Sequence, residues 1–249
     1  MSAHLRLAAA LLALLLSGAS AGAVEVIATV APAKISITAN YSGRSIVVFG
    51  AIAKGEPAHR YDAVITVAGP PQNIIVRRKE RVLGVWVNRR NRTFVAIPSF
   101  LAVFANRKFD DIADGVAQRR YGLGLKHAIF AGESVNESDP FEANLVKARL
   151  DESLYVERQN GVNFVSPAVF RAEVPLPKSV LTGSYDVNMK IFADGALAAH
   201  GAAKFTVEKI GVAQFVVTSS VDHSLIYGLA TMALALATGW IGSVAFRRG

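Results

Sequence analysis

The chain has 249 residues, no cysteine and a formal net charge of +8. Without cysteine it forms no disulfides and carries out no thiol chemistry, which argues against a disulfide-rich extracellular domain. The excess of basic residues indicates affinity for anionic surfaces, lipid headgroups or acidic partners.

Residues 1–23 have the pattern of a signal peptide. Arg6 supplies positive charge, and the apolar run Leu7 to Leu16 is too short to span a bilayer. Small residues follow and fit cleavage after Ala21 or Ala23. We therefore expect export to the bacterial periplasm, where residues 24–222 would form the outer region.

The outer region begins with runs typical of β-strands. They alternate polar and apolar residues or are continuously apolar, and breakers separate them about every ten residues. The expected strands cover residues 24–30, 34–38, 45–51, 62–67, 73–78 and 81–87.

Residues 77–92, RRKERVLGVWVNRRNR, concentrate positive charge around an apolar centre. The basic residues are Arg77, Arg78, Lys79, Arg81, Arg89, Arg90 and Arg92. Basic residues around an aromatic are typical of nucleic-acid binding, but the expected export excludes that partner. Residues 82–87 are apolar at every position, so we expect an interior strand with Trp86 in the core. The basic residues at its two ends are candidate contacts for headgroups, an acidic partner or a small oxyanion.

Residues 98–160 change character and predict a helical insertion. Residues 98–104 can open a helix, and residues 111–116 suggest a short second one. Asp139-Pro140 is the clearest helix start, because an N-cap acid precedes a proline at the first helical position. That helix is expected to end before Asn160-Gly161.

Strands return at residues 170–176, 183–192, 203–209 and 214–218, with a hairpin turn at Ala193-Asp194-Gly195. The predicted fold is mainly β: an immunoglobulin-like β-sandwich whose early and late strands pair, with the helical insertion and one C-terminal transmembrane helix. Two separate small domains are the alternative.

Residues 223–246 are predicted to form that transmembrane helix. The run Ser224 to Phe246 has no charge and would reach roughly 34 Å, enough for a hydrocarbon core of about 30 Å. Arg247 and Arg248 follow and favour a cytoplasmic stub at residues 247–249. The expected location is therefore the bacterial inner membrane, crossed once. Ala235, Gly239 and Ser243 recur every four residues and form a candidate helix–helix interface, although small residues are common in such spans.

Catalytic and cofactor signatures are missing from the sequence. The four histidines that follow the signal peptide are far apart, and no serine-hydrolase, zinc-protease or phosphate-loop motif occurs. Two glycines in Tyr121 to Leu125 are better explained by a turn that ends a helix. We expect no enzyme and no catalytic, cofactor or metal site.

Four segments carry a resemblance to a known family: NIIVRRKERVLGVWVN, VAIPSFLAVFAN, GSYDVNMKIFADG and LIYGLATMALALATGWIGSVAFRR. Together with the signal peptide, the chain resembles a family of alphaproteobacterial proteins named putative transmembrane proteins. The resemblance covers nearly the whole chain and carries over no catalytic residues. It implies a sulfite-exporter-type permease as a candidate partner.

Two functions follow as hypotheses. The first is a membrane-tethered periplasmic accessory protein that assists an integral membrane protein such as a transporter. The second is a binding module for a small oxyanion that uses the arginines of residues 77–92. An enzyme acting on envelope polymers ranks behind both.

Overall fold

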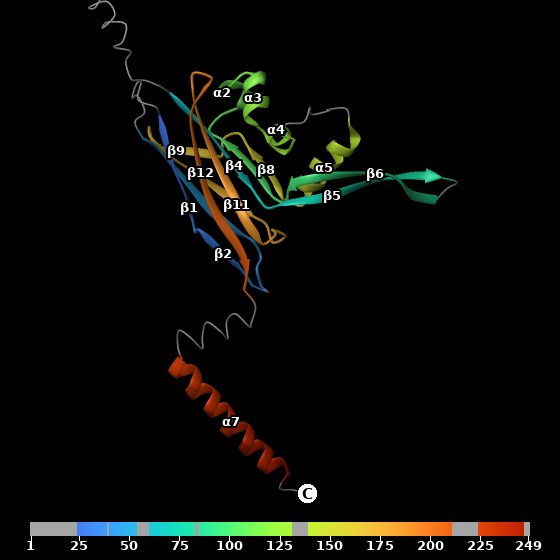
Figure 1. Ribbon diagram of the computed structural model, residues 1–249, viewed down its shortest axis with the longest axis vertical. Helices are drawn as coiled ribbons and strands as arrows, with labels where there is room; N and C mark the ends of the chain where they lie inside the picture. The colour runs from blue at the N-terminus through green and yellow to red at the C-terminus, as the bar shows by residue number, and fades with distance from the viewer. Residues whose placement is uncertain are drawn as a thin grey trace, which may run out of the picture.

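The structure is a computed structural model that describes residues 24–38, 40–53, 60–82, 85–130, 139–210 and 224–246. Two β-sheets, a group of short helices, a long two-stranded hairpin and a C-terminal helix make up its elements (Figure 1). The chain is mainly β, as the sequence predicted. The expected strand at residues 214–218 lies outside the described residues.

The smaller sheet of the sandwich has four antiparallel strands in the order β1-β3-β10-β9. Its strands are β1 (Glu25–Ala31), β3 (Arg44–Ala53), β10 (Val169–Leu176) and β9 (Val162–Ser166). In β10, buried and exposed residues alternate, because successive side chains of a strand point to opposite faces. One face of this sheet therefore enters a core.

The larger sheet has six strands in the order β2-β12-β11-β4-β7-β8. Early and late strands pair as predicted: β2 runs parallel to β12, and β4 antiparallel to β11. Asp194 and Gly195, at φ of 49° and 84°, form the expected tight turn between β11 and β12. The strands are β2 (Lys34–Ile37), β12 (Ala196–Lys209), β11 (Gly183–Ala193), β4 (Tyr61–Ala68), β7 (Leu101–Ala105) and β8 (Tyr155–Arg158).

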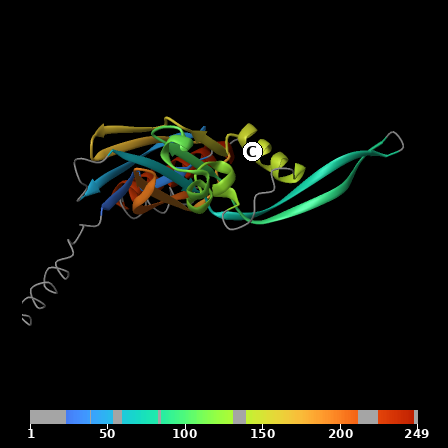
Figure 2. The same cartoon turned by 90° about the horizontal axis from the view of Figure 1, so that it is seen from above.

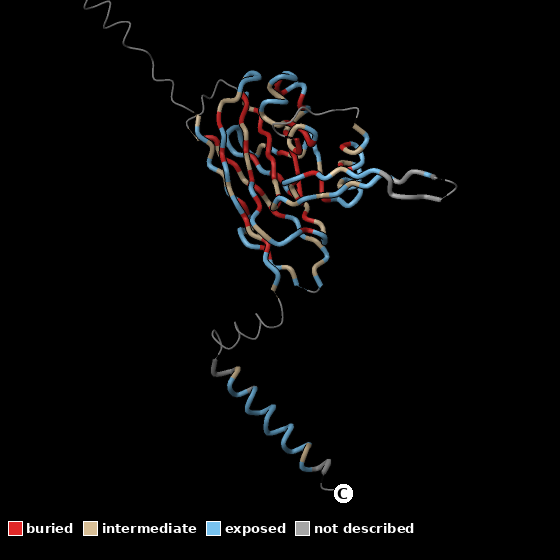
Figure 3. Tube along the Cα trace, turned by 45° about the vertical axis from the view of Figure 1, so that its right-hand side comes forward, coloured by how far each residue is buried: buried red, intermediate tan, exposed pale blue. Residues whose placement is uncertain are grey.

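The core lies between the two sheets. Phe170 and Val174 of β10 and Val187 and Met189 of β11 have no exposed area and belong to one continuous hydrophobic cluster. Figure 3 shows the buried positions gathered inside the two sheets. Because apolar faces of both sheets meet there, the two sheets form a β-sandwich.

Short helices cover the other face of the larger sheet. Six consecutive residues of β4 are buried, so both faces of that strand are shielded from water. On the outer side, the Tyr121 ring meets the Phe192 ring edge-on with centroids 5.7 Å apart. The covering helices are α2 (Phe109–Ile112), α3 (Gly115–Tyr121) and α4 (Leu125–Ile129).

Local capping fixes helix α3. The Asp114 side chain accepts a hydrogen bond from the Ala117 N–H at 2.7 Å, and Gly122 ends the helix in the left-handed conformation at φ 63°. The prediction that the glycines of residues 121–125 form a turn ending a helix is therefore confirmed.

Helix α5 (Pro140–Asp151) starts where the sequence predicted. The Asp139 carboxylate accepts a hydrogen bond from the Phe141 N–H at 2.8 Å, and proline occupies the first turn. The helix ends at Asp151, before Asn160-Gly161 as predicted, and β8 then begins at Tyr155 and runs parallel to β7. The Tyr155 hydroxyl donates to the Pro98 carbonyl at 2.9 Å, which ties the start of β8 to the residues just before β7.

The prediction of a helix at residues 98–104 was wrong. Residues Leu101–Ala105 form strand β7, in which every residue is buried between β4 and β8. A short, continuously apolar run fits either a buried helix or a central strand. Pairing on both edges decides the outcome here.

Strands β5 (Pro71–Val82) and β6 (Val85–Pro98) form a hairpin that we call the arm. Within the described part of the chain, these two strands pair only with each other, so the interior strand expected at residues 81–87 was wrong. The arm projects from the sandwich in Figures 1 and 2. The described pairing of the arm ends at Val82 and Val85, and the side chain of Trp86 lies outside the described residues.

Helix α7 (Ser224–Phe246) has 23 residues and no acidic or basic residue in its terminal turns. Over the residues that the structure describes, no helix qualifies as long and apolar enough to cross a membrane. The large apolar side chains of α7 that the structure describes are exposed, from Leu229 to Ile241 (Figure 3).

Candidate functional site

The arm carries most of the net charge of the protein. It holds all seven basic residues predicted as contacts and one acid, Glu80, so its formal charge is 7 − 1 = +6, against +8 for the whole chain. A long two-stranded ribbon with this charge presents a positive surface away from the sandwich.

The register of the arm brings like charges together. Arg78 lies directly opposite Arg90, and Arg77 lies opposite Asn91. Arg77, Arg78 and Arg90 are exposed. The register therefore concentrates positive charge at this point of the arm.

Neighbouring arginines of the arm face opposite ways. Side chains alternate along a strand, so Arg77 and Arg78 point to different faces of the ribbon. Arg81 is exposed near the far end, opposite Trp86. The backbones of Lys79 and Arg89 belong to the arm, while their side chains lie outside the described residues. The arm thus spreads its charge along both faces.

Arg92 differs from the other predicted contacts, because it is committed to the protein itself. Its guanidinium forms ion pairs with Asp139 and with Glu142, the latter at 3.3 Å. The same group lies 4.8 Å from the centre of the Phe94 ring. Arg92 therefore attaches the root of the arm to the first turn of α5.

The α5 side of this attachment is buried. The Glu142 side chain is only 9% exposed, and one of its carboxylate oxygens has no hydrogen-bond partner among the described residues. A buried carboxylate is stable as a charge only when a cation accompanies it. Arg92 supplies that cation, which gives it a structural role.

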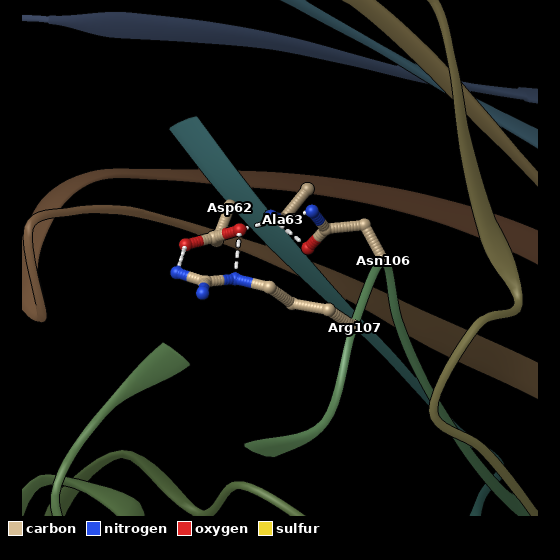
Figure 4. A network of polar contacts seen from close by, with 4 residues as sticks. All are labelled: Asp62, Ala63, Asn106 and Arg107. Atoms are coloured by element: carbon tan, nitrogen blue, oxygen red, sulfur yellow. Dashed lines mark hydrogen bonds and ion pairs between the residues drawn. The ribbon is translucent and has the colours of Figure 1, made fainter. Parts of the chain in front are cut away.

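A second buried ion pair also has a structural explanation. Asp62 is 1% exposed and accepts hydrogen bonds from the Arg107 Nε at 2.6 Å and the Asn106 Nδ2 at 2.9 Å (Figure 4). Asn106 in turn accepts from the Ala63 N–H at 3.0 Å. The hydrogen bond with Asp62 raises the pKa of Arg107. This network fastens the chain after β7 to the start of β4.

The predicted helix–helix interface lies on one side of α7. Ala235, Gly239 and Ser243 are exposed and recur at the four-residue spacing that places them on one helical face. A Cβ added to Gly239 would meet nothing within 4 Å. The described chain leaves this face open, and a partner for it stays a prediction.

Comparison with known proteins identifies the family. The model of the family described as "Putative transmembrane protein (Alph_Pro_TM)" matches residues 25–248. The chain belongs to this family. The matched residues include those of the sandwich, the arm and α7.

Other comparisons add little. No curated protein matches the chain. Among solved structures, the native conformation of E. coli alpha-2-macroglobulin matches at 11% identity and a TM-score of 0.26, over 74% of this chain and 10% of that protein. This family member thus spans about a tenth of that protein, and a likeness this weak supports no argument.

Sequence reasoning missed the polar residues under the short helices. Lys190 lies in a strand that was predicted correctly, but an alternating strand indicates only that its polar face avoids the core. The helices that cover this face come from residues 109–129. No local signal in residues 183–192 announces them.

Proposed function

We propose that this protein is a membrane-anchored accessory protein of the bacterial envelope, and that its arm binds an acidic surface of a partner protein. The observation that carries the proposal is the arm itself. It projects from the sandwich, bears a formal charge of +6 and exposes Arg77 and Arg78 on its two faces. An acidic surface of a partner is complementary to this charge.

Anchoring rests on the family and on the C-terminal sequence. The family is described as transmembrane, and residues 224–246 contain no charged residue and precede Arg247 and Arg248. We propose that α7 crosses the inner membrane once, with the sandwich in the periplasm. An integral membrane protein such as a permease is then the candidate partner, and the face bearing Gly239 is its candidate contact inside the bilayer.

We also assign the sandwich to the immunoglobulin-like class. The order β1-β3-β10-β9 corresponds to strands A-B-E-D, and β12-β11-β4 to strands G-F-C. Tyr185, at the start of β11, donates its hydroxyl hydrogen to the Leu181 carbonyl at 2.7 Å. A tyrosine at the start of strand F that bonds to backbone just upstream is a recurrent feature of such folds. A sandwich of this class is a rigid support for a projecting arm.

Binding of one small oxyanion by the arm is less well supported. A small anion needs donors that converge on one point, whereas Arg77 and Arg78 point to opposite faces and Arg92 is occupied by Asp139 and Glu142. An extended acidic surface can contact both faces. We also propose that the protein has no enzymatic role.

A charge reversal on the arm tests the proposal. The full chain carrying Arg77→Glu and Arg78→Glu is compared with wild type and with a matched reversal on the sandwich, Arg171→Glu and Lys178→Glu, both at exposed positions. Crosslinked complexes are recovered from native membranes at low and high salt. We expect the arm variant to lose a salt-sensitive protein partner that the sandwich variant retains.

Two results would overturn the proposal. Full recovery of the partner by the arm variant would show that the arm is not the contact. Loss of adsorption to vesicles with anionic lipid, without any change in protein partners, would assign the arm to the membrane surface instead.

A further inference from the structure

A cavity of about 350 Å³ lies between the short helices and the outer face of the larger sheet. Its sheet side includes Thr66 of β4 and Asn188 and Lys190 of β11. Thr66 and Asn188 are direct cross-strand neighbours, and Lys190 follows Asn188 on the same face. Three polar side chains therefore form a row beneath the helical cover.

The helical side of the cavity adds more positive charge. Arg119 and Arg120, in the last turn of α3, line the cavity. The Arg120 guanidinium lies 5.6 Å from the centre of the Tyr121 ring, within the range of a cation–π contact. Among the described residues lining the cavity, three are basic and none is acidic. This charge imbalance selects for anions.

Lys190 is the most enclosed of the three cations. Its Nζ donates a hydrogen bond to the Tyr121 carbonyl at the end of α3. Burial lowers the pKa of Lys190, because an ammonium that has lost water is a less stable charge. An ammonium has three donors, so one bond to a carbonyl leaves donors for a ligand. A bound anion would compensate for the lost water.

The rest of the wall is apolar and sets the kind of anion. Ala68, Leu101 and Ala128 line the cavity beside the polar row. At about 30 Å³ per water, the space corresponds to roughly a dozen water molecules, and sites for small organic ligands begin near about 300 Å³. A bare inorganic ion would leave the apolar wall uncovered.

We propose that this cavity binds a small organic anion with a compact apolar body, of the size of an aromatic sulfonate or carboxylate. Lys190 and Arg119 contact the anionic head, Thr66 and Asn188 supply hydrogen bonds, and the apolar wall holds the body. Of the arm, only Pro98 at its root lines this cavity, and the proposal does not depend on the function proposed for the basic residues of the arm.

Titration calorimetry on the full chain in nonionic detergent tests the site, with heats from empty micelles subtracted. Benzenesulfonate is the probe, sulfate has the charge without the body, and benzyl alcohol has the body without the charge. We expect saturable binding of benzenesulfonate and at least about tenfold weaker binding of the other two. No saturable binding of benzenesulfonate, or equally tight binding of sulfate, would overturn the proposal.

Variants locate the binding. Lys190→Met removes the enclosed charge and is expected to weaken benzenesulfonate binding about tenfold or more. Lys178→Met, at an exposed position on the sandwich, is the matched control and leaves binding unchanged. Since Lys190 also supports α3, Arg119→Gln at the exposed opening provides a second variant and is expected to weaken binding severalfold. Unchanged binding in Arg119→Gln and in any folded Lys190→Met would contradict the assignment.

Discussion

Replacement of Arg92 by methionine separates the structural arginine from the others in the arm. Methionine keeps an apolar stem over Phe94 and removes the charge. Glu142 and Asp139 then both lose the cation that pairs with them. Their side chains are only 9% and 15% exposed, respectively, so water compensates little for the loss. The attachment between α5 and the arm is the contact at risk.

The magnitude follows from this burial. Removing one partner of a fully buried ion pair costs about 3–5 kcal/mol, whereas an exposed pair contributes at most about 1 kcal/mol. The Arg92 side chain is 39% exposed, so solvent screens part of the interaction. The expected loss lies between these limits, at about 2 kcal/mol of the free energy of unfolding.

Urea unfolding of the full chain in nonionic detergent, followed by aromatic circular dichroism, measures the loss. Arg77→Met is the matched control on the exposed part of the arm and should change stability by less than about 0.5 kcal/mol. The double variant Arg92→Met with Glu142→Gln should recover part of the loss, because no unpaired charge then stays buried. Equal stabilities of Arg92→Met and Arg77→Met would refute the structural role of Arg92.

Three further predictions concern the sandwich. Tyr185→Phe should cost about 1–3 kcal/mol in urea unfolding, because the Leu181 carbonyl then loses the hydrogen bond from the tyrosine hydroxyl; unchanged stability would contradict this role. Gly50→Ala should destabilise by more than about 1 kcal/mol in the same assay, because its Cβ would lie 2.1 Å from the Phe170 ring. Burial raises the pKa of both Tyr155 and Tyr185 to about 12. Their contribution to the free energy of unfolding should therefore be fully present below pH 10 and be lost as pH rises from about 10 to 12. Tyrosinate absorbance should show these two groups ionising last, and ionisation of all tyrosines near pH 10 in folded protein would contradict it.

Local patterns predicted much of the sandwich. The alternation in residues 183–192, the Asp194-Gly195 turn and the Asp139-Pro140 helix start each depend on neighbours in the sequence. Such signals act through backbone geometry and capping, so tertiary contacts do not change them. The expected pairing of early with late strands is also confirmed.

Two elements required knowledge of the whole fold. Leu101–Ala105 is apolar at every position, and only pairing with β4 and β8 makes it a strand. The run at residues 82–87 is equally apolar, yet its described residues, Val82 and 85–87, belong to a hairpin whose strands pair only with each other in the described chain. Apolar content alone does not distinguish these two environments.

The candidate sites divide in the same way. The basic residues of the arm are visible in the sequence because they are contiguous. That Arg92 is occupied by Asp139 and Glu142 depends on residues about fifty positions away. The cavity at Lys190 depends on α3, whose last residue, Tyr121, lies 69 positions before Lys190. The sequence therefore located the basic residues, but it did not show which residues they meet in the folded chain.

Site-specific photocrosslinking tests directly whether the arm contacts a partner protein. A photoreactive amino acid replaces Arg77 on the arm or, as a control, the exposed Lys178 on the sandwich of the full chain in native membranes. If the arm contacts a partner protein, position 77 crosslinks to a distinct protein and position 178 does not. Crosslinks from position 77 to lipid alone, or the same products from both positions, would contradict it.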